Sequence, residues 1–185
     1  MVKWGKRGLL VLVALLVVAQ VIRPARKNPA IDPKNEISAS VAVPADIGAI
    51  LVRSCNDCHS NRTVWPWYSG VAPVSWLVAY DVNQGRRALN SSEWGTRDPA
   101  KNHEMLGEIC KEVTEKEMPG PIYPLMHSGA GLSDADIQSV CRWTQSVQQG
   151  AAAETKLAAP PVSIAVSTNL PPQQAPAGFR RLTPD

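Results

Sequence analysis

The 185-residue sequence predicts an all-α fold. In four segments of its middle region, apolar residues recur at spacings of three and four, which places them on one side of a helix. The alternating pattern of half-buried strands is essentially absent, and no internal repeat is visible. We therefore expect one helical domain over residues 44–149, about 105 residues long, which is a common domain size.

The N-terminal segment, residues 1–27, predicts a signal anchor. Residues 8–22 read GLLVLVALLVVAQVI, and basic residues stand on both sides of this run. A helix over residues 2–22 would be about 31 Å long at ~1.5 Å per residue, enough for one membrane span if Lys3 and Lys6 extend to the interface. Cleavage after Ala19 is the alternative, but the apolar run continues to Ile22, which favours a retained transmembrane helix.

The segments on either side of the domain differ from it in composition. Residues 28–43 are rich in Pro, Ala, Ser and charge, which is typical of an extended linker, and the Pro-, Ala- and Gln-rich residues 150–185 predict a disordered tail. Residues 36–149 carry nine Lys/Arg and thirteen Asp/Glu, so the domain is acidic. A nucleic-acid partner is not expected, because the basic residues gather beside the N-terminal segment.

Four helices are expected within the domain, at residues 44–54, 73–84 and 101–116 and from Ser133 onward. Gly85 is interpreted as the stop of the second helix. The hydroxyl of Ser133 and the carboxylate of Asp136 have the spacing of a capping box at the start of the fourth. A Met-Pro loop, residues 117–124, separates the last two helices.

Cys55 and Cys58 are separated by two residues, and His59 follows directly. With this spacing each thiol can add across one vinyl group of a haem while the imidazole reaches the iron. The motif therefore predicts one covalently attached haem c, with His59 as the proximal iron ligand.

A zinc site and a thiol redox pair are the alternatives for this motif. Structural zinc needs four Cys or His ligands, usually in two close pairs, and the other two cysteines, Cys110 and Cys141, are far apart in the sequence. A thioredoxin-like pair follows a strand, whereas a helical pattern runs into Cys55. Haem therefore remains the favoured interpretation.

Met118 is the expected sixth iron ligand, because its thioether is a soft ligand that favours Fe(II) and Pro119 stiffens the loop. His127 is the main alternative, and another ligand or none is the third possibility. A six-coordinate iron favours electron transfer, whereas an open position favours a haem enzyme or a sensor of peroxide or a diatomic gas. No residue set predicts hydrolysis, and no catalytic residues are expected.

Cys110 and Cys141 both fall on the apolar sides of their expected helices. In an oxidising compartment a disulfide between them is favoured over two free thiols. The cross-link would stabilise the fold by about 3–4 kcal/mol.

The order helix, CxxCH, middle helices, Met-Pro and C-terminal helix resembles the layout of class I cytochromes c, and Met118 follows His59 by 59 residues, a comparable ligand separation. Four segments are also similar to a family of exported single-haem proteins, the haem-binding domain family: residues 58–69, 72–94, 117–127 and 132–144. The resemblance covers about residues 1–147 and implies haem c and a membrane anchor. The activity of this family is poorly specified.

Together these features predict a membrane-anchored monohaem cytochrome with a class I cytochrome c-like domain, carrying single electrons between redox partner proteins. Because covalent haem attachment in bacteria takes place outside the cytoplasmic membrane, the domain is expected to face the periplasm. One alternative is a haem enzyme or sensor with an open sixth position. Another is an interaction module of a larger redox complex, in which the haem has a structural role.

Overall fold

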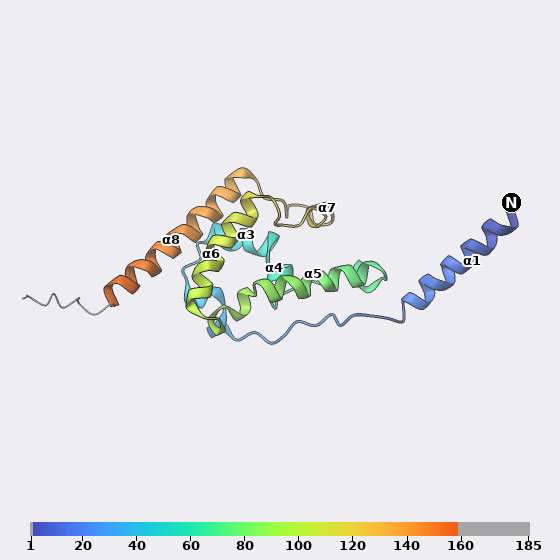
Figure 1. The fold of residues 1–185 in the computed structure, drawn as a ribbon, viewed down its shortest axis with the longest axis horizontal. Helices are drawn as coiled ribbons and strands as arrows, with labels where there is room; N and C mark the ends of the chain where they lie inside the picture. The colour runs from blue at the N-terminus through green and yellow to red at the C-terminus, as the bar shows by residue number, and fades with distance from the viewer. Residues whose placement is uncertain (1, 159–185) are drawn as a thin grey trace, which may run out of the picture.

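The computed structural model describes the backbone of residues 2–158 and the side chains of residues 5–150, and these residues form helices and no strand (Figure 1). The predicted all-α class is confirmed. The α-helices are α1 (Val2–Ala19), α2 (Ile37–Ser40), α3 (Ala45–Ser54), α4 (Asn56–His59), α5 (Val74–Ala88), α6 (Pro99–Thr114), α7 (Tyr123–Met126) and α8 (Asp134–Ala158). Three 3-10 helices are η1 (Pro33–Asn35), η2 (Trp67–Gly70) and η3 (Ser91–Thr96).

The hydrophobic core lies where α6 and α8 pack together and α3 packs against α8. Its buried residues come from the predicted apolar sides of these helices, with additions from α2 and η3: Ile37, Ile47, Ile50, Trp94, Leu106, Val113, Val140 and Trp143. Trp94 is 2% exposed, and the indole of Trp143 donates a hydrogen bond of 2.9 Å to the Ala42 carbonyl. The helical periodicity in the sequence therefore located the core side of α3, α6 and α8 correctly, whereas on α5 Val74 and Leu77 of the expected apolar side are exposed.

Two helix ends differ from the sequence prediction. Helix α5 continues through Gly85 to Ala88, because Gly85 serves a close packing contact rather than a helix stop. Helix α8 continues past Gly150 to Ala158, into the predicted tail. The remainder of that tail, residues 159–185, lies outside the described residues.

Residues 28–43, expected to be an extended linker, are part of the folded domain. The side chain of Asn28 donates to the Thr63 carbonyl at 2.9 Å and accepts from the Trp65 indole at 3.1 Å. Ile37 is buried in the core, and Val41 and Val43 pack against it. These hydrogen bonds and apolar contacts together hold a mostly polar segment onto the domain.

Helix α1 extends away from the rest of the domain (Figure 1), and its apolar side chains from Leu9 onward are exposed. Among the described residues, none of the helices has both the length and the apolar character needed to cross a membrane. The expected transmembrane helix over residues 2–22 is therefore not supported, since α1 ends at Ala19 and includes three basic residues near its start.

The end of α1 is joined to the start of α5 through one side-chain amide. Gln20 accepts a hydrogen bond from the Ala72 backbone N–H at 3.0 Å and donates one to the Ala72 carbonyl at 3.1 Å. The Trp76 indole also donates to the Ile22 carbonyl at 2.7 Å. These contacts determine where the chain leaves α1 and runs along the domain.

A disulfide joins Cys110 of α6 to Cys141 of α8, across a sequence separation of 31, with their Cα atoms 4.7 Å apart. The predicted disulfide is confirmed. It ties together the two longest helices of the core.

Helix α8 begins with the predicted capping box. The Asp136 carboxylate accepts from the Ser133 backbone N–H at 2.9 Å, and the Ser133 hydroxyl accepts from the Asp136 N–H at 3.2 Å. Arg53 of α3 pairs with the same carboxylate at 2.7 Å. The arginine and the Ser133 hydrogen bonds lower the pKa of Asp136 to about 2.

The Asp136 cluster should make stability depend on pH. Because the folded pKa of about 2 lies below the ordinary value of 3.8, the stabilisation is present above about pH 4 and is lost as the pH falls through 2. Asp136→Asn should lower the free energy of unfolding by about 1 kcal/mol at pH 7, a modest loss because the ion pair is partly exposed. In urea unfolding, the difference in free energy of unfolding between Asp136→Asn and wild type should narrow toward pH 2. Asp134→Asn is the control, and it should lower the free energy of unfolding less because its carboxylate is exposed. If Asp136→Asn lowers the free energy of unfolding equally at pH 7 and at pH 2, the lowered pKa of Asp136 does not contribute to stability.

Candidate haem site

The CxxCH motif lies on a single helical turn that follows α3 directly. Cys55 separates α3 from α4, and its carbonyl accepts hydrogen bonds from the Cys58 and His59 N–H groups at 3.2 and 2.9 Å. Neither Cys55 nor Cys58 is in a disulfide. The turn thus brings two free thiols and one imidazole together, as haem attachment requires.

Both thiols stay protonated at neutral pH. Burial raises the pKa of Cys55 to about 11, with a further contribution from Cys58. Burial also raises the pKa of Cys58 to about 11, helped by the carboxylates of Asp81 and Asp57. A thiol–disulfide oxidoreductase uses a lowered thiol pKa, so the environment of this pair is the opposite of a redox-active one.

The His59 imidazole is oriented by two backbone carbonyls at the end of α5. Its Nδ1 lies 3.0 Å from the Gly85 oxygen and 3.2 Å from the Leu89 oxygen. Because carbonyl oxygens only accept, Nδ1 carries the proton and the lone pair of Nε2 remains available for a metal. Burial lowers the His59 pKa, which favours the neutral ring that a metal ligand must have.

Gly85, the expected helix stop, is instead the residue that permits this arrangement. A Cβ at position 85 would lie 2.5 Å from the Cys58 oxygen and 2.9 Å from the Cys58 Cβ. Only glycine therefore lets α5 approach α4 closely enough to present its carbonyl to His59.

Asp57, between the two cysteines, connects the motif to two loops. One carboxylate oxygen accepts from the Val64 N–H at 2.8 Å, and the other accepts from the Tyr123 hydroxyl at 2.7 Å. Burial and the bond to Asp57 both raise the pKa of Tyr123, which therefore remains a donor. The contact places the segment after Met118 beside the CxxCH turn.

The two sixth-ligand candidates differ in how their side chains are engaged. His127 Nδ1 donates to the Tyr123 carbonyl at 3.1 Å, so Nε2 accepts from the Tyr68 hydroxyl at 3.3 Å. The His127 ring also stacks on the Tyr123 ring, with centroids 4.0 Å apart. Met118 is 42% exposed, and its backbone N–H donates to the Glu112 carbonyl at 3.2 Å. Binding of iron by His127 Nε2 would break its hydrogen bond with Tyr68. Binding of iron by the Met118 thioether would leave the hydrogen bonds of His127 and of the Met118 backbone in place.

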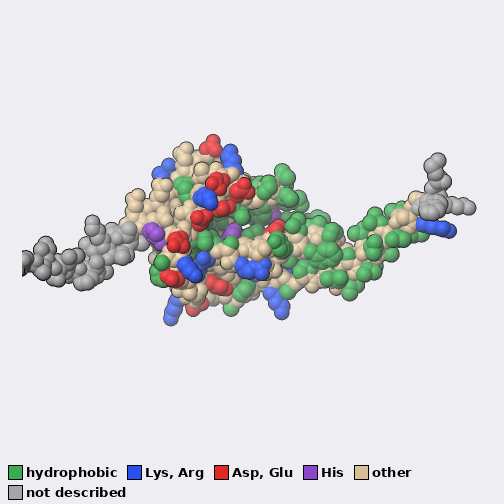
Figure 2. Space-filling view, viewed as in Figure 1, with side chains coloured by type: hydrophobic (Ala, Val, Ile, Leu, Met, Phe, Trp, Pro, Cys, Tyr) green, Lys and Arg blue, Asp and Glu red, His purple; other side chains and the backbone are tan. Residues whose placement is uncertain are grey.

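Exposed apolar side chains lie on α5 and α7, the two helices that contact the motif, and Figure 2 shows them gathered there. They come from α5 and from the segment after Met118: Val74, Leu77, Ile122, Leu125 and Met126. A haem has two large apolar faces that must be covered by side chains. The thiols, the free imidazole nitrogen and this apolar surface therefore fit a haem.

Arg86 fixes the chain that follows the motif, a role the sequence did not reveal. Its guanidinium donates to the Ser60 carbonyl at 2.9 Å, the Lys27 carbonyl at 2.9 Å, the Asn28 side chain at 2.8 Å and the Thr63 hydroxyl at 2.8 Å. These partners are far from Arg86 in the sequence, so no local pattern could have identified them.

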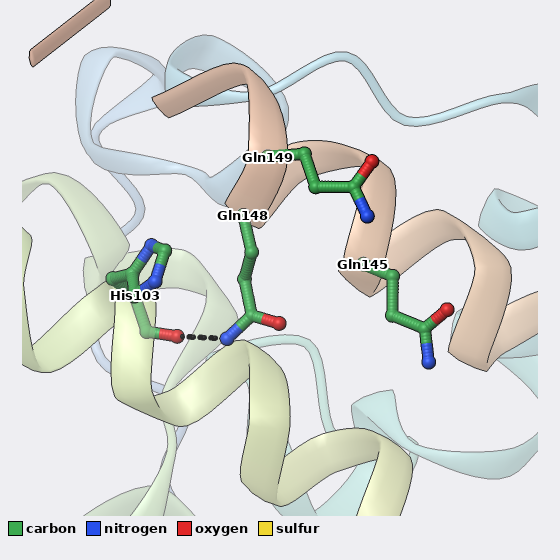
Figure 3. Close-up of a pocket in the computed structure, with 4 residues that line it drawn as sticks. All are labelled: His103, Gln145, Gln148 and Gln149. Atoms are coloured by element: carbon green, nitrogen blue, oxygen red, sulfur yellow. Dashed lines mark hydrogen bonds between the residues drawn. The ribbon is translucent and has the colours of Figure 1, made fainter. Parts of the chain in front are cut away.

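A shallow pocket elsewhere lies between α6 and α8 and is lined by His103, Gln145, Gln148 and Gln149 (Figure 3). Gln148 donates to the His103 carbonyl at 2.7 Å. None of the residues expected to hold haem lines this pocket. Across the part of the chain that the structure describes, no group of three or more His, Cys, Asp or Glu side chains is placed to hold a metal ion directly.

These features place the chain among helical haem-binding proteins. Comparison with protein families agrees, because the model described as "Haem-binding domain" matches residues 14–146. The chain belongs to the haem-binding domain family, as the sequence resemblance predicted, and the match includes Cys55, Cys58, His59 and Met118. No curated protein and no solved structure gives a significant match.

Gly85→Ala should disturb the site through packing alone. The added methyl group would push α5 away from Cys58 and move the carbonyl that orients His59, so we expect a loss of about 1–3 kcal/mol in urea unfolding and less haem retained per protein. Gly48→Ala is the matched control, because a Cβ at that position of α3 meets no atom within 4 Å and should be neutral or stabilising. If Gly85→Ala and Gly48→Ala have the same free energy of unfolding and retain the same amount of haem, the close contact at Gly85 does not control the geometry of the site.

Proposed function

We propose that the protein is a monohaem c-type cytochrome that carries single electrons between redox partner proteins. Cys55 and Cys58 hold the haem covalently, and His59 binds its iron. The observation that carries the proposal is the bond from His59 Nδ1 to the Gly85 carbonyl, which leaves Nε2 free on a turn with two unpaired thiols. A bound haem supplies a reversible one-electron Fe(III)/Fe(II) couple.

Met118 is the proposed sixth ligand. The engagement of both His127 nitrogens supports this choice over His127. The packing of α3 against α8, with the motif directly after α3 and Met118 before α8, supports a class I cytochrome c-like arrangement. Two protein ligands leave no position for a substrate, which favours an electron carrier over an enzyme or sensor.

An oxidising compartment, the periplasm or its equivalent, is the proposed location of the domain. The Cys110–Cys141 disulfide supports it, because such cross-links persist outside the reducing cytoplasm. Covalent haem attachment points to the same compartment.

Covalent attachment is tested by extraction. Haem should stay with the denatured chain in acid-acetone, and the double variant Cys55→Ala/Cys58→Ala should release it, because the thioether bonds are then absent. Cys110→Ser/Cys141→Ser is the control and should keep its haem. Complete extraction from the wild type would rule the proposal out.

Ligation by Met118 is tested by its removal. Met118→Ala should keep the haem but open the sixth position to cyanide or carbon monoxide, and should lower the reduction potential by on the order of 100 mV, because a ligand that favours Fe(II) is lost. His127→Ala should leave the spectrum and potential near those of wild type. If the two variants behave the other way round, His127 is the ligand.

A further inference from the structure

We infer that Tyr123 is a positioning residue that holds the Met118 loop against the haem-attachment turn, with Asp57 as its anchor. The inference rests on the proposed function, because it concerns how Met118 is kept at the iron. Neither the family match nor the CxxCH motif assigns a role to Tyr123 or Asp57.

The loop that carries Met118 is attached to the domain on both sides. Before it, the Glu112 carbonyl at the end of α6 accepts from the Glu117 and Met118 N–H groups at 3.0 and 3.2 Å. After it, the Tyr123 hydroxyl donates to Asp57 at 2.7 Å. Tyr123 follows Met118 by five residues, and five residues of extended chain reach at most about 18 Å. The bond from Tyr123 to Asp57 therefore restricts how far Met118 can lie from α4.

The anchor of this loop, Asp57, lies on the same short helix as His59. Asp57 lies within α4, its carbonyl accepts from the Thr63 hydroxyl at 2.7 Å, and its second carboxylate oxygen holds the Val64 N–H at 2.8 Å. A hydrogen bond to a carboxylate is roughly twice as strong as one between neutral groups. The Tyr123–Asp57 bond therefore positions the loop relative to the turn that presents His59.

The Tyr123 ring is itself held in place. It stacks on the His127 imidazole with an angle of 19° between the ring planes, and His127 is fixed in turn by the Tyr68 hydroxyl. The stacking gives His127 a packing role beside the site that does not depend on iron.

The position of the Met118 loop should affect how easily an external ligand replaces Met118 at the iron. A thioether held close to the metal competes with external ligands as an intramolecular group, and freedom of its loop weakens that competition. Loss of a hydrogen bond to a charged group should make displacement of Met118 about ten- to a hundredfold easier. The proximal ligand and the covalent bonds should be unaffected.

The test is cyanide binding to the oxidised holoprotein, measured by stopped flow together with the reduction potential. Tyr123→Phe keeps the stacked ring and removes only the hydroxyl. It should raise the binding rate about tenfold or more and lower the potential toward that of Met118→Ala. Asp57→Asn should act in the same direction and less strongly, because the neutral amide still accepts a hydrogen bond. Tyr80→Phe is the control, since its exposed hydroxyl on α5 only accepts from Gln84 at 2.8 Å.

The possible results separate the inference from the proposed function. If Met118→Ala binds cyanide faster than wild type but Tyr123→Phe matches Tyr80→Phe in rate and potential, the positioning role is wrong and the ligand assignment stands. If wild type already binds cyanide as fast as Met118→Ala, both are overturned. A loss of thermal stability in Tyr123→Phe without a change in rate or potential identifies a purely structural role and also contradicts the inference.

Discussion

The close approach of α5 to α4 at Gly85 is the constraint on which the rest of the site depends. A four-residue helix is not stable by itself, so the geometry of the CxxCH turn must be imposed by its neighbours. The missing side chain at position 85 allows the Cys58 backbone to lie against α5. The same contact supplies the carbonyl that accepts a hydrogen bond from His59 Nδ1–H, which leaves the lone pair of Nε2 free to bind a metal. One packing contact thereby sets the position of the turn and the chemistry of its histidine.

The domain has two parts that are stabilised differently. Around α3, α6 and α8, apolar side chains are buried and the Cys110–Cys141 disulfide adds a cross-link. Around α4, α5 and α7, polar contacts through Arg86 and Asp57 hold the chain, while residues such as Leu77 and Leu125 remain exposed. A haem between these elements would bury that apolar surface, so haem binding should stabilise this part of the fold by mass action.

The sequence could predict the features that depend on local periodicity or a short motif. The apolar sides of α3, α6 and α8, the Ser133–Asp136 capping box and the CxxCH turn all have such signals, and the disulfide follows from two cysteines on matching helix sides. The role of Gly85 cannot be read from the sequence, because glycine both ends helices and permits close packing, and only tertiary contacts distinguish these roles. The Tyr123–Asp57 bond joins residues 66 positions apart and has no local signal. The composition of residues 28–43 predicts a linker, because a few apolar residues in a polar segment give no periodicity.

An electron carrier must keep the same iron ligands in both oxidation states, so each ligand should be positioned by contacts that do not depend on the iron. For His59 those contacts are the carbonyls of α5. For Met118 under the proposed function they are the Glu112 carbonyl before it and the Tyr123–Asp57 bond after it. Asp57 lies inside the CxxCH motif, and the proposed attachment of haem does not use its side chain. Its two carboxylate oxygens instead hold two loops to the turn that carries the cysteines, so under the proposed function the motif would both attach the haem and organise the chain around it.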